Sequence, residues 1–485
     1  MKALLGFVIT TLLLIVRNES LLAQPESLWT RAYGGSESWE YGWGIHAMPD
    51  GGCIVAADAQ PQPNSAEKPW LLRLDASGDT VWTRFANAGL GGEAYSIELT
   101  HNGDVVAAGT VGYHQPIMCQ AWLAKFTANG DSVWSREFGG PGDQIIYKVR
   151  ETPDGGFILA GLGCFDGNYL PDFYVIRTDS LGDSLWTCHY GGNARDQAWS
   201  VDVTHDGGFI VAGGTDSFGQ GGEVWLLRLN PDGSVLWAQT LAPSPGLDEA
   251  DDVRETPDHG FILVGQYEAA EFLAIKTDSA GTVEWQRNYL PFSDNHDIAR
   301  SVLLMPDGGY LLAGATTGNA ANEGGLIRIT SQGDVVWRSA YRAPGDNVQS
   351  AFWGCDLMPN GQVYLSGYGN CDASGGTDLW IMKLDAEDLS AAQPRFVNTA
   401  QSSLESFPNP FNSTTTLAFS LPRAEEVVVS VYDVLGRQVE TLAKETRGMG
   451  KQRLVFDGSP LSTGTYFITL SSHDVNISRK VMLLK

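Results

Sequence analysis

A turn signature recurs along this chain at nearly constant intervals, and this repeat constrains the fold more than any other feature. One copy reads Asp154-Gly155-Gly156, followed by an apolar run. The first residue of the signature recurs at spacings of 52, 52, 52, 52, 49 and 53 residues, at Asp50, Asn102, Asp154, Asp206, Asp258, Asp307 and Asn360. A fixed period of this length is typical of proteins built from stacked, similar units.

Each repeat contains four short apolar runs separated by turn residues. In the repeat around Asp206 the runs are Trp199–Val203, Phe209–Gly213, Val224–Leu229 and Val235–Thr240. Their length and their content of Val, Ile, Phe and Trp favour strands over helices. Gly-containing turns between such runs indicate antiparallel hairpins. Four strands in each repeat of about 52 residues predict an all-β fold built from the blades of a β-propeller.

The count of signatures predicts how the ring closes. The turn occurs seven times, but the tryptophan of the fourth strand occurs only six times after the first turn, at Trp82, Trp134, Trp186, Trp237, Trp285 and Trp337. The seventh copy is Trp29, which precedes the first turn. We therefore expect a seven-bladed propeller over residues 24–385, in which the N-terminal strand completes the last blade and removes an open sheet edge.

Two other residue types recur in every repeat, and both have an architectural interpretation. The tryptophan of the fourth strand is expected to pack between blades. A basic residue near the end of the third strand could form a positive ring for an anion, but pairing with an acidic neighbour explains its repetition better. These basic residues are Arg73, Lys125, Arg177, Arg228, Lys276, Arg328 and Lys383.

The two ends of the chain differ from the repeats. Residues 1–23 have a short charged start, an apolar core and a small terminal residue, which is the pattern of a cleavable signal peptide. Residues 386–404 lose the repeat and are rich in small polar residues, as in a linker. Residues 405–485 contain alternating apolar runs, which predict a small antiparallel sandwich.

Five ordered motifs in this last segment carry a family resemblance. They are Phe407-Pro-Asn-Pro-Phe-Asn412, Leu421-Pro422, Val431-Tyr-Asp-Val-Leu-Gly-Arg437, Gly464-Thr-Tyr-Phe467 and Lys480-Val-Met-Leu-Leu-Lys485. Together they resemble the C-terminal sorting domain of type IX secretion cargo, and the resemblance covers essentially all 81 residues. Ser413 is a mild departure, since the family commonly has Pro after the first motif.

The resemblance implies an Ig-like sandwich that the type IX secretion machinery recognises as its partner. It also implies a protein that is secreted or attached to the outer-membrane surface. The sorting-motif residues that it identifies are Pro408, Asn409, Pro410, Phe411, Asn412, Gly436, Lys480 and Lys485.

Charge and composition exclude several function classes. The net charge is −26, and the last 81 residues carry nine Lys/Arg against eight Asp/Glu, so the acidity belongs to the predicted propeller and linker. Nucleic-acid binding is not expected, because phosphate contacts need basic patches. No segment is long and apolar enough to predict a transmembrane span. The six cysteines include no Cys-x-x-Cys pair, and local bridges Cys355–Cys371 or Cys164–Cys188 are alternatives left open.

Acidic residues about ten positions before each turn are the candidate ligand-binding residues. They precede each predicted innermost strand, near the axis of the ring, where carboxylates could bind Ca²⁺, a cation or a sugar. The alternative is that each one caps a local turn by accepting backbone hydrogen bonds. The residues are Glu40, Glu93, Asp143, Asp196, Asp248, Asp297 and, a little earlier relative to its turn, Asp346.

The sequence contains no recognisable catalytic, phosphate-binding or dinucleotide-binding motif. His101, His205 and His259 lie at turn tips in different repeats and could meet around a ligand, but polar turn residues are the plainer account. We therefore expect no cofactor, no catalytic residues and no resident metal, with Ca²⁺ at the candidate carboxylates as the alternative left open.

These observations favour an exported, monomeric binding module for a carbohydrate, a surface polymer or another protein. A glycan-active enzyme with axial carboxylates and a passive surface-layer component are the alternatives.

Overall fold

The computed structural model describes residues 25–485 except for short gaps. The gaps are residues 26, 36–38, 61–64, 87–90, 113–118, 141, 166–169, 245, 269–270, 290–296, 318–321, 346–348, 371–375, 387–388, 390–404, 408, 410, 422–424, 434–436, 448–449 and 472–475. The chain forms two compact units, one spanning Gln24–Ala392 and the other containing Gln393–Lys485. The predicted signal peptide, and the predicted linker apart from Ala386 and Leu389, lie outside the described residues.

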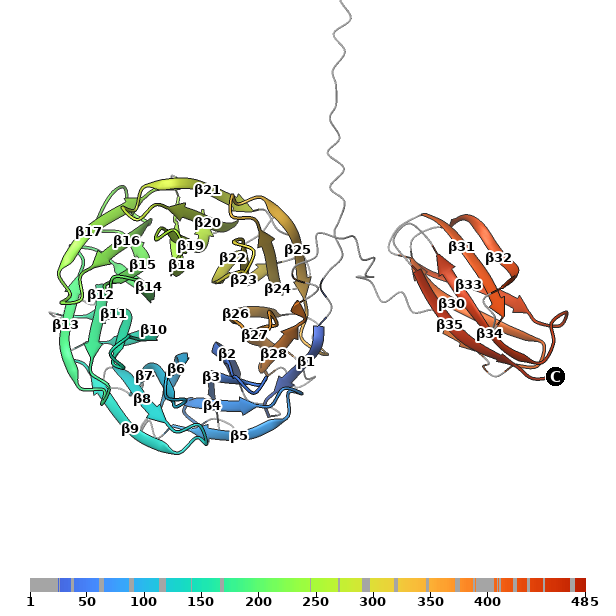
Figure 1. Cartoon of the computed structure of the whole chain (residues 1–485), viewed down its shortest axis with the longest axis horizontal. Coiled ribbons are helices and arrows are strands. Elements are labelled where there is room, and N and C mark those ends of the chain that lie inside the picture. Colours follow the sequence, from blue (N-terminus) through green and yellow to red (C-terminus); the bar gives the residue numbers. More distant parts are fainter. Residues whose placement is uncertain are drawn as a thin grey trace, which may run out of the picture. The chain divides into compact units, whose positions relative to one another are not determined.

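The larger unit consists of seven four-stranded antiparallel sheets arranged around a central axis (Figure 1). The first three sheets contain β2 (Glu40–Ala47), β3 (Cys53–Ala59), β4 (Lys68–Leu74), β5 (Thr80–Phe85); β6 (Gly92–Leu99), β7 (Val105–Val111), β8 (Gln120–Phe126), β9 (Ser132–Phe138); and β10 (Gln144–Glu151), β11 (Phe157–Cys164), β12 (Pro171–Thr178), β13 (Ser184–Tyr190).

The next three sheets contain β14 (Asp196–Val203), β15 (Phe209–Thr215), β16 (Glu223–Leu229), β17 (Val235–Leu241); β18 (Glu249–Glu255), β19 (Phe261–Tyr267), β20 (Glu271–Thr277), β21 (Val283–Tyr289); and β22 (Ile298–Leu304), β23 (Tyr310–Thr317), β24 (Asn322–Ile329), β25 (Val335–Tyr341). This arrangement confirms the predicted all-β propeller.

The last sheet shows how the ring closes. It contains β26 (Ser350–Leu357), β27 (Val363–Gly369) and β28 (Asp378–Leu384), and its outer strand is β1 (Ser27–Tyr33) from the start of the chain. β1 pairs antiparallel with β28, so that Tyr33 lies opposite Leu379. The predicted closure by the N-terminal strand is confirmed, because β1 covers the edge of β28 and completes the last blade as a four-stranded sheet.

The turn signature joins the first and second strands of each blade through a left-handed residue. In six blades this residue is glycine, with φ between 79° and 93°, at Gly51, Gly103, Gly155, Gly207, Gly308 and Gly361. Glycine adopts this conformation without the steric cost that a Cβ atom brings. The fifth blade has His259 at the same place, with φ of 63°.

The recurring basic residue pairs with the carboxylate of the turn. The Arg177 side chain is only 7% exposed, and its Nη2 lies 2.6 Å from Asp154 Oδ1. Its Nη1 also donates to the main-chain oxygens of Phe157 and Thr178. Equivalent ion pairs are Arg73–Asp50, Arg228–Asp206, Lys276–Asp258 and Arg328–Asp307. Lys125 bonds Asp104 instead, and Lys383 donates to the carbonyl of Gly51. We call this interaction the turn clamp, and it fits the architectural interpretation.

The recurring tryptophan packs against the neighbouring blade. Trp82 Nε1 donates to Ala128 O, in the outer hairpin of the next blade, at 3.1 Å. A Cβ atom built on Gly130 would lie 2.9 Å from the Trp82 ring, so the glycine makes room for the indole. Trp29, Trp186 and Trp285 make the same bond to Ala76, Pro231 and Ser331. Apolar clusters between blades complete the propeller core.

The second unit is a two-layer β-structure. One sheet has the order β29 (Glu405–Phe407), β30 (Thr414–Leu421), β33 (Gly450–Asp457). The other has the order β32 (Gln438–Arg447), β31 (Glu425–Asp433), β34 (Gly464–Ser471), β35 (Asn476–Leu483). One apolar cluster, which includes Phe411, Val429, Phe456 and Ile468, forms its core. The specifically Ig-like character of this unit stays a prediction.

Sorting-motif residues hold the C-terminal strand of this unit in place. Asn409 accepts a hydrogen bond from Met482 N at 2.9 Å and donates to Lys480 O at 3.0 Å. Phe411 is 1% exposed, and its backbone bonds both Met482 and Leu484. Lys485 Nζ donates to Ser459 O at 2.7 Å. Asn412 is exposed, and Pro408, Pro410 and Gly436 lie outside the described residues.

Among the described cysteines, Cys53, Cys119, Cys164, Cys188 and Cys355 are free thiols. The Cys164–Cys188 bridge that the sequence left open is therefore absent, while Cys371 lies outside the described residues.

The turn clamp predicts acid sensitivity. Partial burial alone would raise the pKa of Asp206, but hydrogen bonds from Thr204 and Gly208 and the Arg228 guanidinium lower it to about 2. Because the ordinary value is about 3.9, this carboxylate stabilises the fold above about pH 4 and loses that contribution as the pH falls towards 2. Asp206→Asn should lower the urea midpoint at pH 7 and flatten its decline between pH 4 and pH 2.

The matched control is Glu137→Gln, which changes an exposed carboxylate on β9. Equal midpoints for wild type and Asp206→Asn at pH 7 would show that the clamp contributes no stability.

Candidate functional site

The innermost strand of every blade has a β-bulge at the same position. The pairing of first and second strands shifts by one residue in all seven blades, for example between Gly42 and Gly44 in β2 and between Ala198 and Ser200 in β14. The extra residue always lies seven positions before the turn signature. These bulge residues are Trp43, Tyr95, Tyr147, Trp199, Asp251, Arg300 and Trp353, and all seven line a cavity on the axis.

Five of the bulge residues form a continuous aromatic arc around the axis. We use this name for Trp353, Trp43, Tyr95, Tyr147 and Trp199. Successive ring centroids are 4.6, 5.1, 5.1 and 4.4 Å apart in this order. Most neighbours meet edge to face, which is a favourable geometry for aromatic pairs. Each ring comes from a different strand, so the arc exists only in the closed propeller.

An ion pair occupies the part of the layer that the arc leaves open. Arg300 Nη1 bonds Asp251 Oδ1, and the guanidinium carbon lies 4.2 Å from the centroid of the Trp353 ring. Burial raises the pKa of Asp251 to about 6, although Arg300 opposes that shift. The layer therefore combines aromatic rings with one tightly held charge pair.

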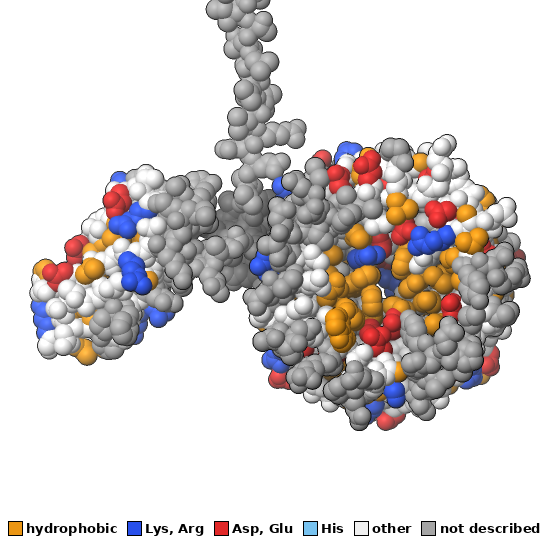
Figure 2. Space-filling view, turned by 180° about the vertical axis from the view of Figure 1, so that it is seen from behind, with side chains coloured by type: hydrophobic (Ala, Val, Ile, Leu, Met, Phe, Trp, Pro, Cys, Tyr) orange, Lys and Arg blue, Asp and Glu red, His pale blue; other side chains and the backbone are white. Residues whose placement is uncertain are grey.

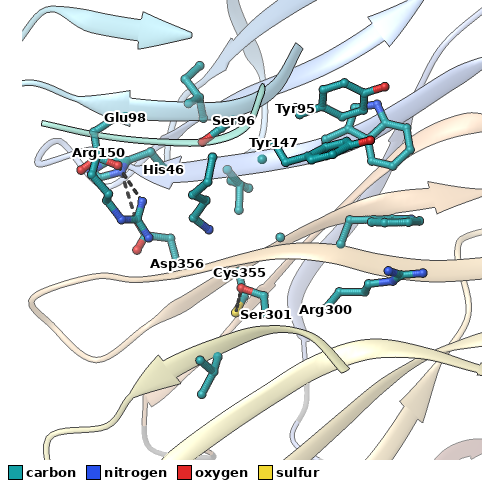
Figure 3. Close-up of a pocket in the computed structure, with 18 of the residues that line it drawn as sticks. His46, Tyr95, Ser96, Glu98, Tyr147, Arg150, Arg300, Ser301, Cys355 and Asp356 are labelled. Carbon is teal, nitrogen blue, oxygen red and sulfur yellow. Dashed lines mark hydrogen bonds and ion pairs between the residues drawn. The ribbon is translucent and has the colours of Figure 1, made fainter. Parts of the chain in front are cut away.

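A second layer of side chains lies three residues further along the same strands. We call it the charge ring, and it consists of His46, Glu98, Arg150, Asp202, Arg254 and Asp356, with Leu303 in the sixth blade. Arg150 lies 2.9 Å from Glu98 and 3.5 Å from Asp202, so it joins three consecutive blades. Figure 3 shows Arg150 and Glu98 on one side of the pocket, with Tyr95 and Tyr147 further along it.

The two layers enclose a pocket of about 680 Å³. Figure 2 shows hydrophobic side chains gathered around the middle of one face, with acidic and basic side chains beside them. Several buried polar atoms in this lining have no hydrogen-bond partner within the described part of the chain, among them Nε1 of Trp199 and of Trp353 and Oδ2 of Asp251. Unfilled hydrogen-bonding capacity of this kind is uncommon in folded proteins and calls for water or a ligand.

The predicted carboxylates lie at the starts of the innermost strands and bond their own loops. Asp196 accepts from Gly192 N at 2.8 Å and from the hydroxyls of Thr215 and Ser217. Asp248 accepts from Ser244 N at 2.8 Å and from Glu268 N at 2.9 Å.

The other predicted carboxylates are distributed in the same way around the ring. Asp143 accepts from Cys119 N at 3.0 Å, while Glu40 and Asp297 are buried. Glu93 accepts from the Tyr95 hydroxyl and so supports the aromatic arc. Asp346 lies outside the described residues. The structure shows local bonding for Asp143, Asp196 and Asp248, and their role as a common ligand site stays a prediction.

Sequence reasoning did not identify the bulge residues or the charge ring, although a signal for them was present. When the repeats are aligned on the turn, the column seven positions upstream reads Trp, Tyr, Tyr, Trp, Asp, Arg, Trp. This column holds large polar or aromatic residues whose identity differs between repeats. Such variation indicates that the blade architecture does not determine which residue stands there. The column five positions upstream is far more uniform, because it reads Ile, Ile, Val, Val, Val, Val, Cys.

The C-terminal unit matches a known family. Residues 405–484 match the secretion system C-terminal sorting domain family. The chain carries a type IX sorting domain. This domain directs secretion through the type IX system to the cell surface or the extracellular space. No helix of the described residues has the length and apolar character needed to cross a membrane.

Comparison of the whole chain with known proteins shows only low sequence identity. No curated protein matches the sequence. Solved structures with similar arrangements include the surface component PorZ of the type IX system of Porphyromonas gingivalis, at 11% identity and a TM-score of 0.31, covering 92% of this chain and 51% of PorZ. This chain thus spans about half the length of that protein.

Two further structures are similar at the same low level of identity. The propeller domain of the trilobed protease from Pyrococcus furiosus has 10% identity and a TM-score of 0.40, covering 73% of this chain and 98% of the domain. A puromycin hydrolase has 12% identity and a TM-score of 0.47, covering 78% and 58% of the two chains.

The charge ring predicts a pH dependence of stability. Burial raises the pKa of Asp202 to about 6, although Arg150 opposes the shift. The folded protein therefore favours the protonated carboxyl, and this contribution is present below about pH 4 and lost as the pH rises through 6. In Asp202→Asn the side chain is neutral at every pH. The melting temperature of this variant minus that of wild type should therefore increase between pH 4 and pH 7. A difference in melting temperature between Asp202→Asn and wild type that stays constant from pH 4 to pH 7 would contradict the raised pKa of Asp202. Glu137→Gln is the control.

Proposed function

We propose that this protein is an extracellular binding module whose axial pocket takes a carbohydrate. The aromatic arc is the observation that carries the proposal. A sugar ring presents apolar C–H faces that pack on aromatic rings, and the arc offers five such side chains around one cavity. Type IX export delivers the propeller to the compartment where surface and extracellular glycans occur.

The size and polarity of the pocket support the same choice. Binding pockets for small ligands are typically about 300–1,000 Å³, with aromatic walls and a few fixed polar groups. The pocket of about 680 Å³ falls within this range. Asp251, Arg300 and the unpaired indole N–H groups supply donors and acceptors for hydroxyl groups.

A glycan-active enzyme is the second candidate, and one observation favours it. Asp202 and Asp251 both line the pocket, and burial raises the pKa of each to about 6. Perturbed carboxyl groups in a cleft are candidates for general acid–base work. The binding module ranks first because both carboxyl groups are held by arginine side chains.

Affinity measurements on variants of the arc test the proposal. The propeller should bind at least one oligosaccharide in an array of immobilised glycans. Calorimetry would then give the dissociation constant for that oligosaccharide. Tyr147→Ala and Trp199→Ala should each weaken binding about tenfold, equivalent to roughly 1.4 kcal/mol. Trp199→Phe should lose less, because it keeps an aromatic face and fills most of the same space.

The control is Phe85→Ala on the outer strand β5, where an exposed aromatic side chain lies far from the axis. Unchanged affinity in both arc variants would rule out the axial pocket. If the glycan is cleaved, and Asp202→Asn binds it without cleaving it, the second candidate replaces the first.

A further inference from the structure

One blade departs from the turn signature. In the fifth blade the left-handed residue is His259, with φ of 63°, where the other six blades have glycine. A residue with a Cβ atom adopts this conformation at a cost. Such an exception within a repeat points to a role for the side chain that glycine lacks.

The His259 side chain meets a histidine from the preceding blade. Its ring lies against that of His205, with centroids 3.6 Å apart and planes inclined by 29°. Glu255, at the end of β18, lies beside both rings. Its Oε1 is 2.6 Å from His205 Nδ1 and 3.6 Å from His259 Nδ1. One ligand atom from each of the three residues lies within 4.8 Å of the other two.

The backbone fixes this cluster before any ligand arrives. His205 N donates to Glu255 Oε2 at 2.7 Å, which holds the carboxylate with Oε1 towards the imidazoles. Both histidine side chains are about half exposed, whereas that of Glu255 is 13% exposed. The carboxylate is thus positioned by the fold, and the two imidazoles remain accessible from solvent.

We propose that His205, Glu255 and His259 form a binding site for a divalent transition metal ion, best fitted to Zn²⁺. Two imidazoles and one carboxylate match the ligand types of Zn²⁺, and three protein ligands leave a position for water or a partner's side chain. Ca²⁺ fits poorly, because it prefers six to eight oxygen ligands. The site joins the turns of two adjacent blades.

The same propeller contains a natural comparison in which the third ligand is missing. His101 and Glu151 repeat the arrangement one pair of blades earlier, with Nδ1 of His101 2.5 Å from Glu151 Oε2. His101 N donates to the same carboxylate at 2.7 Å. The residue equivalent to His259 is Gly155, which has no side chain. This pair should therefore bind the metal far more weakly.

The test is Zn²⁺ titration of the full chain, purified without a polyhistidine tag, by calorimetry and by thermal unfolding. The wild type should bind one Zn²⁺ per chain and gain melting temperature, whereas Ca²⁺ should have no effect at this site. His259→Gly is the decisive variant, because it restores the ordinary turn. Without metal it should melt at a higher temperature than wild type, yet bind Zn²⁺ at least about tenfold more weakly.

Two further variants complete the design. His101→Ala should leave the Zn²⁺ affinity unchanged. Gly155→His should create a second site, since a Cβ atom there meets nothing closer than Ser180 Cβ at 3.9 Å. Failure of wild type to bind Zn²⁺, or equal affinity in wild type and His259→Gly, would overturn the proposal. Because His205, Glu255 and His259 do not line the axial pocket, the result for the Zn²⁺ site is independent of carbohydrate binding.

Discussion

The turn clamp is the interaction on which the rest of the propeller depends. A guanidinium group as buried as that of Arg177 is tolerated only when its charge and its N–H groups are satisfied. Asp154 and two main-chain carbonyls meet that need, and in doing so they join the first hairpin to the third strand. Equivalent ion pairs join the same two elements in four other blades, at Arg73–Asp50, Arg228–Asp206, Lys276–Asp258 and Arg328–Asp307. The inner strands that carry the bulge residues and the charge ring are thus tied to their blades in the same way in most of the ring.

Repetition of the architecture leaves particular positions free to differ. The clamp, the left-handed turn residue and the packed tryptophan have the same structural task in nearly every blade, so they recur. Bulge side chains enter the axial cavity, where they contact one another across blades but take no part in the repeated packing between sheets. Aromatic residues, Asp251 and Arg300 can therefore share one layer. His259 is a second departure from the repeat, at a surface turn and away from the axis.

The fold could be predicted because its information is local and repeated. Four apolar runs, two turns and one tryptophan specify a blade, and the displaced Trp29 specifies closure. The site was less accessible to sequence reasoning. Asp196 and Asp248 drew attention as acidic residues near the axis, but such residues are equally suited to bonding loop N–H groups, and the structure shows those bonds. The sequence does not distinguish Trp43 and Tyr147 from core residues, because an aromatic residue in a strand usually belongs to the core.

The sequence by itself determined the number of blades, the order of strands, the position of the closing strand and the export signal at residues 405–484. These follow from periodicity and from contiguous motifs, which need no knowledge of distant contacts. Only the tertiary structure decided which side chains reach the axis, because a β-bulge changes the face on which each following residue lies. It also brought His205 beside His259, since residues 54 positions apart meet only when adjacent blades pack.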